Sequence, residues 1–568
     1  MIPNRRTDRT DRTERALGRP ALALALAAAI ASCCPPAAKP AQPTPTPAVT
    51  EPEPPAPTEP PAPPAPPEIK PVTQTAQPQE LLFPDEPFRA TQPAPGPVRP
   101  FRLPAVQTFK LASGIDVFLV EQHTLPIVSL DLSFDGGSIA DPPGKEGLAS
   151  VCMAMLGEGT ESKDKLAFSE ALADIASSVS AYAGADTQGV SLSSLTKHLD
   201  ATFALFVDAL LHPGFRADDF DRMVKRRIEG IKQAKGSPDA IAGRVTAPAL
   251  YGAAHPYGRI STEASLAALT LDDCRAHHAR WLHPGGARLF VVGDITAAEV
   301  RARFADPALA AWKGKVPPLP KLPKPATVPA RIVFVDVPGA SQSQVGFVHF
   351  GPLRNAPDYL PTSLAGTIFG GSFTSRVNMN LRENKGYSYG ARGGFQYSRQ
   401  YGAVTAGASV RADATYQSLI ELHAELVALQ SGKTPPSAAE VDREKAGTIL
   451  GMPSRFASAG SSLGMFRSLV YFGLPLDYWS TYTDKVGKVT ATQVAAAAHK
   501  HLKPDQAVYV VVGDGYTPVV VRNGAADEPL LRDGQPVTMR QALEQLVADG
   551  TLGKGGLLVV DADGKPLP

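Results

Sequence analysis

Residues 146–160 read EGLASVCMAMLGEGT, a run of small and apolar residues closed by two glycines. Apolar side chains spaced three and four apart, followed by glycine, predict one buried helix, which we place at residues 145–156. Cys152 lies in this helix, and Cys274 is far from it in the sequence. No C-x-x-C pair is present, so the sequence favours neither a cysteine metal site nor a disulfide framework. We interpret Cys152 as a small apolar core residue.

The chain has 568 residues, a formal net charge of +1 and 20% charged residues. This length exceeds what one hydrophobic core serves, so at least two domains are expected. The balanced charge argues against a nucleic-acid-binding protein and against strongly acidic partners.

Two segments of the chain end alike. Residues 282–294 read LHPGGARLFVVGD and residues 502–514 read LKPDQAVYVVVGD, with seven of thirteen positions identical and no gap. A match of this length predicts two tandem copies of one α+β domain. The alternative is that two unrelated final strands have converged on Val-Val-Gly-Asp.

The predicted organisation follows from changes in composition and periodicity. Strands are expected at residues 109–111, 115–119 and 127–134, and helices at 163–177, 199–211 and 217–233. A helix at 539–548 and a strand at 557–560 are expected near the end of the chain. We place a signal peptide at 1–33, a Pro-rich spacer at 34–104, the first domain at 105–312, a linker at 313–330, the second domain at 331–515 and a C-terminal extension at 516–568.

The N-terminus has the pattern of a targeting segment. Several arginines precede the apolar run at residues 21–30, which is too short to cross a bilayer. The following Ile30-Ala31-Ser32-Cys33 resembles the bacterial lipobox. That resemblance implies lipidation of Cys33 and a cell-envelope location on the periplasmic side, at the outer membrane because Cys34 rather than Asp comes next. An ordinary cleaved signal peptide is the alternative. Residues 35–100 hold 24 of the 56 prolines, which predicts an extended segment without a core.

Residues 370–389, GGSFTSRVNMNLRENKGYSY, complete the set of informative motifs. With residues 146–160, LPIVS at 125–129, GSIADP at 137–142 and HPYG at 255–258, they resemble the pitrilysin (insulinase-like) zinc metallopeptidases. The resemblance covers about residues 106–514. It implies an α+β fold of two homologous domains, each an antiparallel-rich sheet flanked by helices.

In that family, the metal-binding helix has the sequence pattern G-x-A-H-x-x-E-H-M-L-x-x-G-T. The resemblance therefore places Ser150, Met153 and Ala154 where the first His, the catalytic Glu and the second His belong. Gly230 falls at the third ligand, a Glu, and the neighbouring Glu229 is about 100° away around a helix and is interpreted as a solvated charge. A hydroxyl, a thioether and a methyl group cannot replace imidazole and carboxylate as zinc ligands. None of the eleven histidines forms a His-x-x-x-His pair, so we predict no metal in this chain.

The second domain retains a different part of the family pattern. Arg382 and Tyr389 match an Arg and a Tyr that, by this resemblance, reach the zinc site across a central chamber. A guanidinium can donate paired hydrogen bonds to a substrate carbonyl, and a phenol can donate to the oxyanion of the transition state. Without the family pattern, Arg382 is a solvated helix charge and Tyr389 packs on a sheet. Tyr387 is expected on the same strand face as Tyr389.

The resemblance implies a non-zinc subunit of a heterodimeric metallopeptidase, inactive alone, with a zinc-bearing insulinase-like partner and a peptide substrate. Arg382 and Tyr389 would then act in trans on the partner's zinc site. The alternative is a non-enzymatic, lipid-anchored protein that binds peptides or serves as a scaffold in the cell envelope. An autonomous zinc peptidase would need a metal site that the sequence does not contain.

Overall fold

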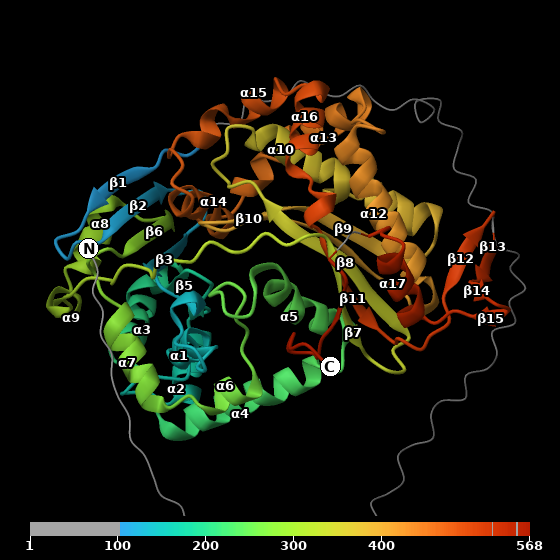
Figure 1. The fold of residues 1–568 in the computed structure, drawn as a ribbon. Coiled ribbons are helices and arrows are strands. Elements are labelled where there is room, and N and C mark those ends of the chain that lie inside the picture. Colours follow the sequence, from blue (N-terminus) through green and yellow to red (C-terminus); the bar gives the residue numbers. More distant parts are fainter. Residues whose placement is uncertain (1–102, 525, 553–554, 568) are drawn as a thin grey trace, which may run out of the picture. The chain divides into compact units, whose positions relative to one another are not determined.

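The computed structural model describes residues 103–524, 526–552 and 555–567. The expected signal peptide, Cys33 and the Pro-rich spacer up to residue 102 lie outside the described residues. Two six-stranded sheets organise the described chain, each with helices packed against it (Figure 1).

The first sheet has the strand order β1-β2-β6-β3-β5-β4. Its centre is formed by β3 (IVSLDLSFD), in which apolar and polar residues alternate, and by β6 (RLFVVG), whose nearly continuous apolar residues suit a strand covered on both faces. Strand β6 runs parallel to β2 and antiparallel to β3. The strands are β1 (Gln107–Lys110), β2 (Asp116–Glu121), β3 (Ile127–Asp135), β4 (Ser178–Ala183), β5 (Thr187–Leu195) and β6 (Arg288–Gly293).

The second sheet has the order β16-β7-β11-β8-β10-β9. Strand β11 runs parallel to β7 and antiparallel to β8, which repeats the arrangement around β6. The two VVGD motifs therefore end equivalent strands, and the prediction of two homologous domains is confirmed. The strands are β7 (Arg331–Asp336), β8 (Gln342–Gly351), β9 (Ser388–Tyr397), β10 (Gly402–Arg411), β11 (Val508–Gly513) and β16 (Leu557–Val559).

The helices of the first domain connect β3 to β4 and β5 to β6, and two more follow β6. The helix expected at residues 199–211 is confirmed without a shift, and the one expected at 217–233 extends one residue further. The helices are α1 (Leu148–Met155), α2 (Lys165–Ala173), α3 (Leu199–Leu211), α4 (Ala217–Ala234), α5 (Pro238–Tyr251), α6 (Glu263–Ala267), α7 (Leu271–Trp281), α8 (Ala297–Phe304) and α9 (Pro307–Ala311).

The second domain repeats this plan with one local difference. Two π-helical turns, Thr367–Gly371 and Met379–Asn384, interrupt the helical segment between β8 and β9. Such turns are rare and are frequent at functional sites. The helices are α10 (Tyr359–Gly366), α11 (Arg376–Asn378), α12 (Thr415–Ser431), α13 (Ala438–Leu450), α14 (Ala459–Tyr471), α15 (Tyr482–Gly487), α16 (Ala491–His501) and α17 (Met539–Ala548).

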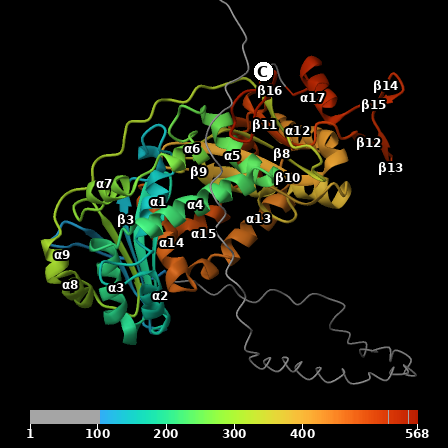
Figure 2. The same cartoon turned by 90° about the horizontal axis from the view of Figure 1, so that it is seen from below.

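One helix of each domain packs against the sheet of the other domain. The first domain's α5 places Ile241 and Val245 against Val510 of β11, and the second domain's α14 places Phe466 against Phe290 of β6. Figure 2 shows α14 beside the first domain and α5 beside the second. Apolar burial of this kind holds the two domains together.

Ion pairs reinforce the contact between the domains. Arg467 on α14 donates to buried Asp131 of β3 at 2.9 Å, and Arg399 donates to Asp135 at 2.9 Å. A charged group that loses its contact with water needs a partner of opposite charge. Here the second domain supplies the arginines and the first domain supplies the aspartates.

The last residues of the chain belong to the second domain. Strand β16 pairs in parallel with β7, and α17 buries Met539, Leu543 and Leu546 in the core of this domain. The residues that we assigned to a separate extension thus complete the second sheet. Two short hairpins precede α17: β12 (Val520–Asn523) with β13 (Ala526–Pro529), and β14 (Leu531–Arg532) with β15 (Gln535–Pro536).

Residues 313–330, the expected linker, contain no helix or strand. Among the described residues, no helix has both the length and the apolar character that crossing a membrane requires.

Candidate functional site

Helix α1 begins at Leu148, three residues later than expected. Gly147 adopts φ of 101°, a left-handed conformation that glycine adopts without strain, and it separates the helix from Lys145. The Asp141 carboxylate then accepts the backbone N–H groups of Gly147 and Ala149, both at 2.9 Å. Burial raises the pKa of Asp141 to about 6, although these two hydrogen bonds favour the ionised form. The GSIADP motif thus fixes the start of α1.

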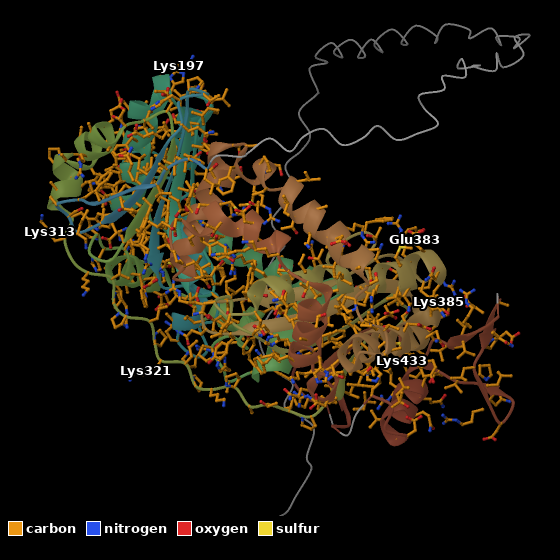
Figure 3. All side chains as sticks on the ribbon, turned by 90° about the horizontal axis from the view of Figure 1, so that it is seen from above. Lys197, Lys313, Lys321, Glu383, Lys385 and Lys433 are labelled. Carbon is orange, nitrogen blue, oxygen red and sulfur yellow. A yellow bond between two sulfur atoms is a disulfide. The ribbon has the colours of Figure 1, made fainter. Side chains whose placement is uncertain are left out.

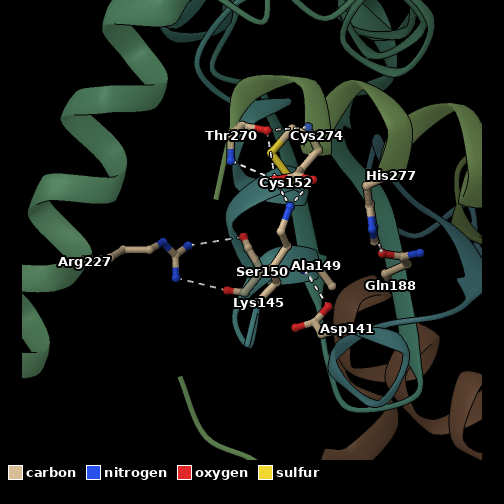
Figure 4. Close-up of a disulfide and its surroundings, with 11 residues drawn as sticks. Asp141, Lys145, Ala149, Ser150, Cys152, Gln188, Arg227, Thr270, Cys274 and His277 are labelled. Atoms are coloured by element: carbon tan, nitrogen blue, oxygen red, sulfur yellow. Dashed lines mark hydrogen bonds and ion pairs between the residues drawn. A yellow bond between two sulfur atoms is a disulfide. The ribbon is translucent and has the colours of Figure 1, made fainter. Parts of the chain in front are cut away.

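A disulfide joins Cys152 on α1 to Cys274 on α7, with the two Cα atoms 4.7 Å apart (Figure 4). The interpretation of Cys152 as a lone core residue was therefore wrong. The partners are 122 residues apart in the sequence, and only the packing of α1 on α7 brings them together. Sequence spacing alone gives no sign of such a pair, except that these are the only two cysteines after Cys34.

Three of the four degenerate metal-site positions, those of the three ligands, line one pocket of about 610 Å³ between α1 and α4. Ser150 and Ala154 lie one turn apart on α1, and Gly230 faces them from α4. A Cβ atom placed on Gly230 would meet no atom within 4 Å, so open space adjoins this position. The pocket therefore stands where the family resemblance places a metal, but the three ligand positions offer a hydroxyl, a methyl group and bare backbone.

Met153 does not share this pocket. It is 1% exposed and packs in the core between α1 and the first sheet, beside Leu132 and Phe206. A carboxylate at this position would be buried among apolar side chains, which opposes the charged form. The position that the family uses for its catalytic Glu thus serves as core in this chain.

Arg227 of α4 reaches across the pocket to α1, as Figure 4 shows. Its guanidinium donates to the hydroxyl oxygen of Ser150 at 3.0 Å and to the carbonyl oxygen of Ser150 at 3.3 Å. Burial and the neighbouring charge of Arg226 lower the pKa of Arg227. A protein cation thus contacts the position of the first missing zinc ligand.

Sequence reasoning assigned no role to Arg227 and considered only the neighbouring Glu229. The available signal was spacing: Arg227 is four residues after Met223 and four before Ile231, and both of these are buried. Glu229, by contrast, behaves as expected for a solvated charge. It is about half exposed and pairs with Lys232 at 2.8 Å.

The residues that remain do not form a metal site. Among the described residues, no group of three or more His, Cys, Asp and Glu side chains could hold a metal ion. His277 is buried and pairs with Gln188 at 2.8 Å, and His278 contacts the Leu210 carbonyl oxygen at 2.7 Å. Each of these two adjacent histidines thus has a structural partner of its own.

The second motif, residues 370–389, is anchored by several of its own residues. A Cβ atom on Gly370 would lie 2.4 Å from the nitrogen of Gly393, so only glycine allows this approach to β9. Arg376 pairs with Glu440 at 2.9 Å, and buried Asn378 accepts the N–H of Ala391 at 3.0 Å. These contacts fix the segment on both sides of Arg382.

Arg382 lies in the second π-helical turn and Tyr389 near the start of β9. The Arg382 side chain is 41% exposed, pairs with its neighbour Glu383 at 3.2 Å and lies over the ring of Phe373. Tyr389 is 91% exposed, so it does not pack on the sheet. In Figure 3, the labels of Glu383 and Lys385 mark this turn on the second domain. Neither Arg382 nor Tyr389 lines the pocket at Ser150.

Tyr387 and Tyr389 do not share a strand face, which corrects our expectation. Tyr387 is 1% exposed in the core of the second domain. Ser388 pairs with Val410 and Ala391 with Ala408, so two residues of β9 lie opposite Ser409. This β-bulge interrupts the simple alternation that the sequence suggested and leaves Tyr389 in solvent.

The fold and the residues of α1 define the class of protein. The chain has two peptidase-type domains, and the first of them lacks the metal-ligand side chains on α1. The family model described as Insulinase (Peptidase family M16) matches residues 116–257, and the one described as Peptidase M16 inactive domain matches residues 268–448. Together the two matches span more than half of the chain, which belongs to the M16 peptidase family.

Similar proteins fit this assignment. The crystal structure of a peptidase M16 inactive domain from Pseudomonas fluorescens is 29% identical, with a TM-score of 0.66, and the match covers 72% of this chain and 98% of that one. A protease structure from Helicobacter pylori has a TM-score of 0.65 at 18% identity, covering 72% of this chain and all of that one. The non-peptidase homolog YmxG of Helicobacter pylori is 21% identical over 70% of this chain and 92% of its own length.

Proposed function

We propose that this chain is the metal-free subunit of a two-chain M16 peptidase. It binds peptide and presents Arg382 and Tyr389 to the zinc site of a partner subunit. The observation that carries the proposal is selective loss. The first domain has Ser150, Ala154 and Gly230 at its ligand positions, whereas the second domain keeps Arg382 and Tyr389.

The exposure of Tyr389 supports this role. A tyrosine that is 91% exposed on a strand contributes little to the stability of its own fold, yet its surroundings are firmly built. Its hydroxyl is free to donate to an oxyanion on another chain. Arg382 offers a planar guanidinium for a substrate carbonyl. The two side chains thus have the chemistry of transition-state stabilisers, and both are accessible to solvent.

The comparisons support the loss of independent activity. The Pseudomonas fluorescens structure is described as an inactive M16 domain, and the Helicobacter pylori relative is named a non-peptidase homolog. A chain of this kind needs a metal-bearing partner if it is to take part in hydrolysis. We expect that partner to be an M16 chain with an intact His-x-x-Glu-His helix and bound zinc.

The test is to mix the purified chain with a zinc-bearing M16 protein from the same organism and to measure hydrolysis of a quenched fluorescent peptide. We expect the mixture to exceed the sum of the two chains. Tyr389→Phe should lower the kcat of the mixture about 100- to 1,000-fold, because one oxyanion donor is lost. Tyr516→Phe is the matched control, since Tyr516 is also exposed and lies outside the motif.

Two results would overturn the proposal. The zinc-bearing chain could reach full activity without this one, or Tyr389→Phe could leave the mixed activity at the level of Tyr516→Phe. Co-purification of the two chains on gel filtration, before and after each substitution, separates a lost complex from a lost catalytic contribution.

We also propose that the chain resides in the cell envelope, anchored through lipid on Cys33. The lipobox-like Ile30-Ala31-Ser32-Cys33 carries this inference, and the disulfide between Cys152 and Cys274 supports it, because disulfides persist mainly in oxidising compartments. Metabolic labelling with a radioactive fatty acid tests it. Cys33→Ser should abolish the label and release the protein from the membrane fraction.

The second candidate function is a non-enzymatic one, in which the chain binds peptides or a protein partner as a scaffold. The name of the Helicobacter pylori relative favours it, because that protein is called a non-peptidase homolog. This reading predicts no gain of hydrolysis with any zinc-bearing M16 chain and no effect of Tyr389→Phe on any rate.

A further inference from the structure

The pocket between α1 and α4 is rich in cations. Arg226, Arg227 and Arg244 line it, and Glu158 is its single acidic lining residue. Glu158 is already paired, because Lys165 donates to both of its carboxylate oxygens at 2.7 Å. Arg226 at 3.7 Å and Arg222 at 3.4 Å also pair with Glu158, so one carboxylate serves three cations and the pocket keeps a net positive charge.

Among these arginines, Arg227 has the positive charge with the fewest compensating negative groups. Its two hydrogen bonds go to the hydroxyl and carbonyl oxygens of Ser150, which are neutral acceptors. No ion pair joins it to a carboxylate within the described residues. The nearby Arg226 repels it, and the side chain is partly buried. A partly desolvated guanidinium gains strongly from an anion that reaches its remaining N–H donors.

One wall of the same pocket already holds a carboxylate from elsewhere in the chain. Asp563, near the end of the chain, accepts from Arg244 at 2.5 Å and from Lys235 at 2.7 Å. Burial opposes ionisation of Asp563, but the hydrogen bonds from Lys235 and Arg244 keep its pKa below the usual value. Arg244, which lines the pocket, thus already holds one carboxylate together with Lys235.

We propose that the emptied metal pocket binds a peptide carboxylate, with Arg227 as the principal ligand-binding residue and Arg226 at the rim. The guanidinium of Arg227 stands beside Ser150, where the family would have a metal ligand, and offers a bidentate partner for a planar anion. The carboxylate is either the C-terminus of the peptide or an Asp or Glu side chain.

The rest of the pocket suits the neighbouring part of a peptide. Met223, Ile231 and Leu266 give it an apolar wall, and the open space at Gly230 leaves room beside the arginines. Pockets that combine an apolar wall with a few convergent polar groups are typical ligand sites. The inference deepens the peptide binding of the proposed function and names the chemical group that is recognised.

The experiment measures peptide binding to the full chain alone by fluorescence anisotropy, with no partner subunit present. Four labelled peptides share one apolar sequence and form two pairs. In the first pair, one peptide ends in a free carboxylate and the other in an amide. In the second pair, both end in an amide, and one carries an internal Glu where the other carries Gln. We expect one acidic peptide to bind about 10- to 100-fold more tightly than its neutral match. Which pair shows the difference identifies the source of the carboxylate.

Arg227→Gln should remove this preference and bring acidic and neutral peptides within about threefold. Lys232→Gln is the matched control, because it removes a charge from the same helix outside the pocket. Equal binding within both peptide pairs overturns the inference, as does an equal loss in Arg227→Gln and Lys232→Gln.

A second measurement serves if Arg227→Gln melts at a much lower temperature than the parent chain. Sodium acetate should then displace the acidic peptide from the unaltered protein at lower concentrations than sodium chloride. Equal displacement by the two salts would overturn the inference. A negative outcome here leaves the trans role of Tyr389 untouched, since that role is measured by hydrolysis in the mixture.

Discussion

The two domains use the same helix pair but secure it by different chemistry. In the first domain α1 packs on α7, and in the second domain α10 packs on α16 at the equivalent place. The first pair is joined by the disulfide Cys152–Cys274 and by an ion pair from Lys145 to Asp273 at 2.6 Å. In the second pair, Asp358 at the start of α10 accepts from Lys500 and His501 of α16, both at 2.8 Å.

This difference shows what the first domain has kept. Helix α1 no longer carries metal ligands, yet it is the helix with a covalent link to its neighbour. The link also positions Ser150, and through it the guanidinium of Arg227. A pocket of fixed geometry is consistent with the peptide binding proposed above.

The largest effect should come from removing the covalent link. The double variant Cys152→Ala/Cys274→Ala should lose about 3 to 5 kcal/mol of stability, because the bond closes a loop of 122 residues in the unfolded chain. The measurement is urea unfolding of the oxidised parent and of the variant. Dithiothreitol should lower the parent to the level of the double variant and leave the variant unchanged. A parent that does not respond to dithiothreitol would show that the bond is absent.

The sequence predicted the two-domain fold well because its evidence was local and repeated. The VVGD segments end equivalent strands, and the helices at residues 199–211 and 539–548 have the bounds that their apolar spacing indicated. Boundaries failed where backbone geometry decided them. Gly147 delays α1, and the helix expected at residues 163–177 ends at Ala173, shortly before Ala176 adopts φ of 47°.

The candidate site was only partly predictable, because its new features depend on tertiary contacts. Ser150, Ala154 and Gly230 were found through the family motif, and the structure places them around one pocket. The disulfide partner of Cys152 lies on another helix, and Arg227 of α4 donates to Ser150 of α1. Such contacts join residues that are far apart in the sequence, so no local pattern identifies them.

A smaller effect, of similar size in the two domains, should come from one buried histidine in each. Burial lowers the pKa of His277 in the first domain to about 4, and it lowers the pKa of His349 in the second domain to about 4. Both stay neutral in the folded protein while the unfolded chain takes up a proton below about pH 6.5. Stability is therefore complete above that pH and falls as the pH drops toward 4, by roughly 3 kcal/mol for each histidine.

His277→Asn and His349→Asn test this, because each keeps a polar side chain but cannot titrate. In each variant, the slope of the unfolding free energy against pH between 6.5 and 4 should fall by up to about 1.4 kcal/mol per pH unit. His123→Gln is the contrasting control. The hydrogen bond to Asp294 raises the pKa of His123, so its contribution is present below the unfolded pKa and is lost as the pH rises. An unchanged slope in both Asn variants would contradict the prediction.

The smallest effect should come from the ion pairs that the two helix pairs have in parallel. Asp358→Asn removes the charge that links the start of α10 to α16, and Lys145→Gln removes the charge that links the segment just before α1 to α7. Each should cost about 0.5 to 1 kcal/mol, since the side chains are partly exposed and screened by solvent. The two costs should shrink together in 1 M salt. If Asp358→Asn costs as much as the loss of the disulfide, then the second domain depends on its ion pairs as strongly as the first depends on its covalent bond, and the contrast between the two domains fails.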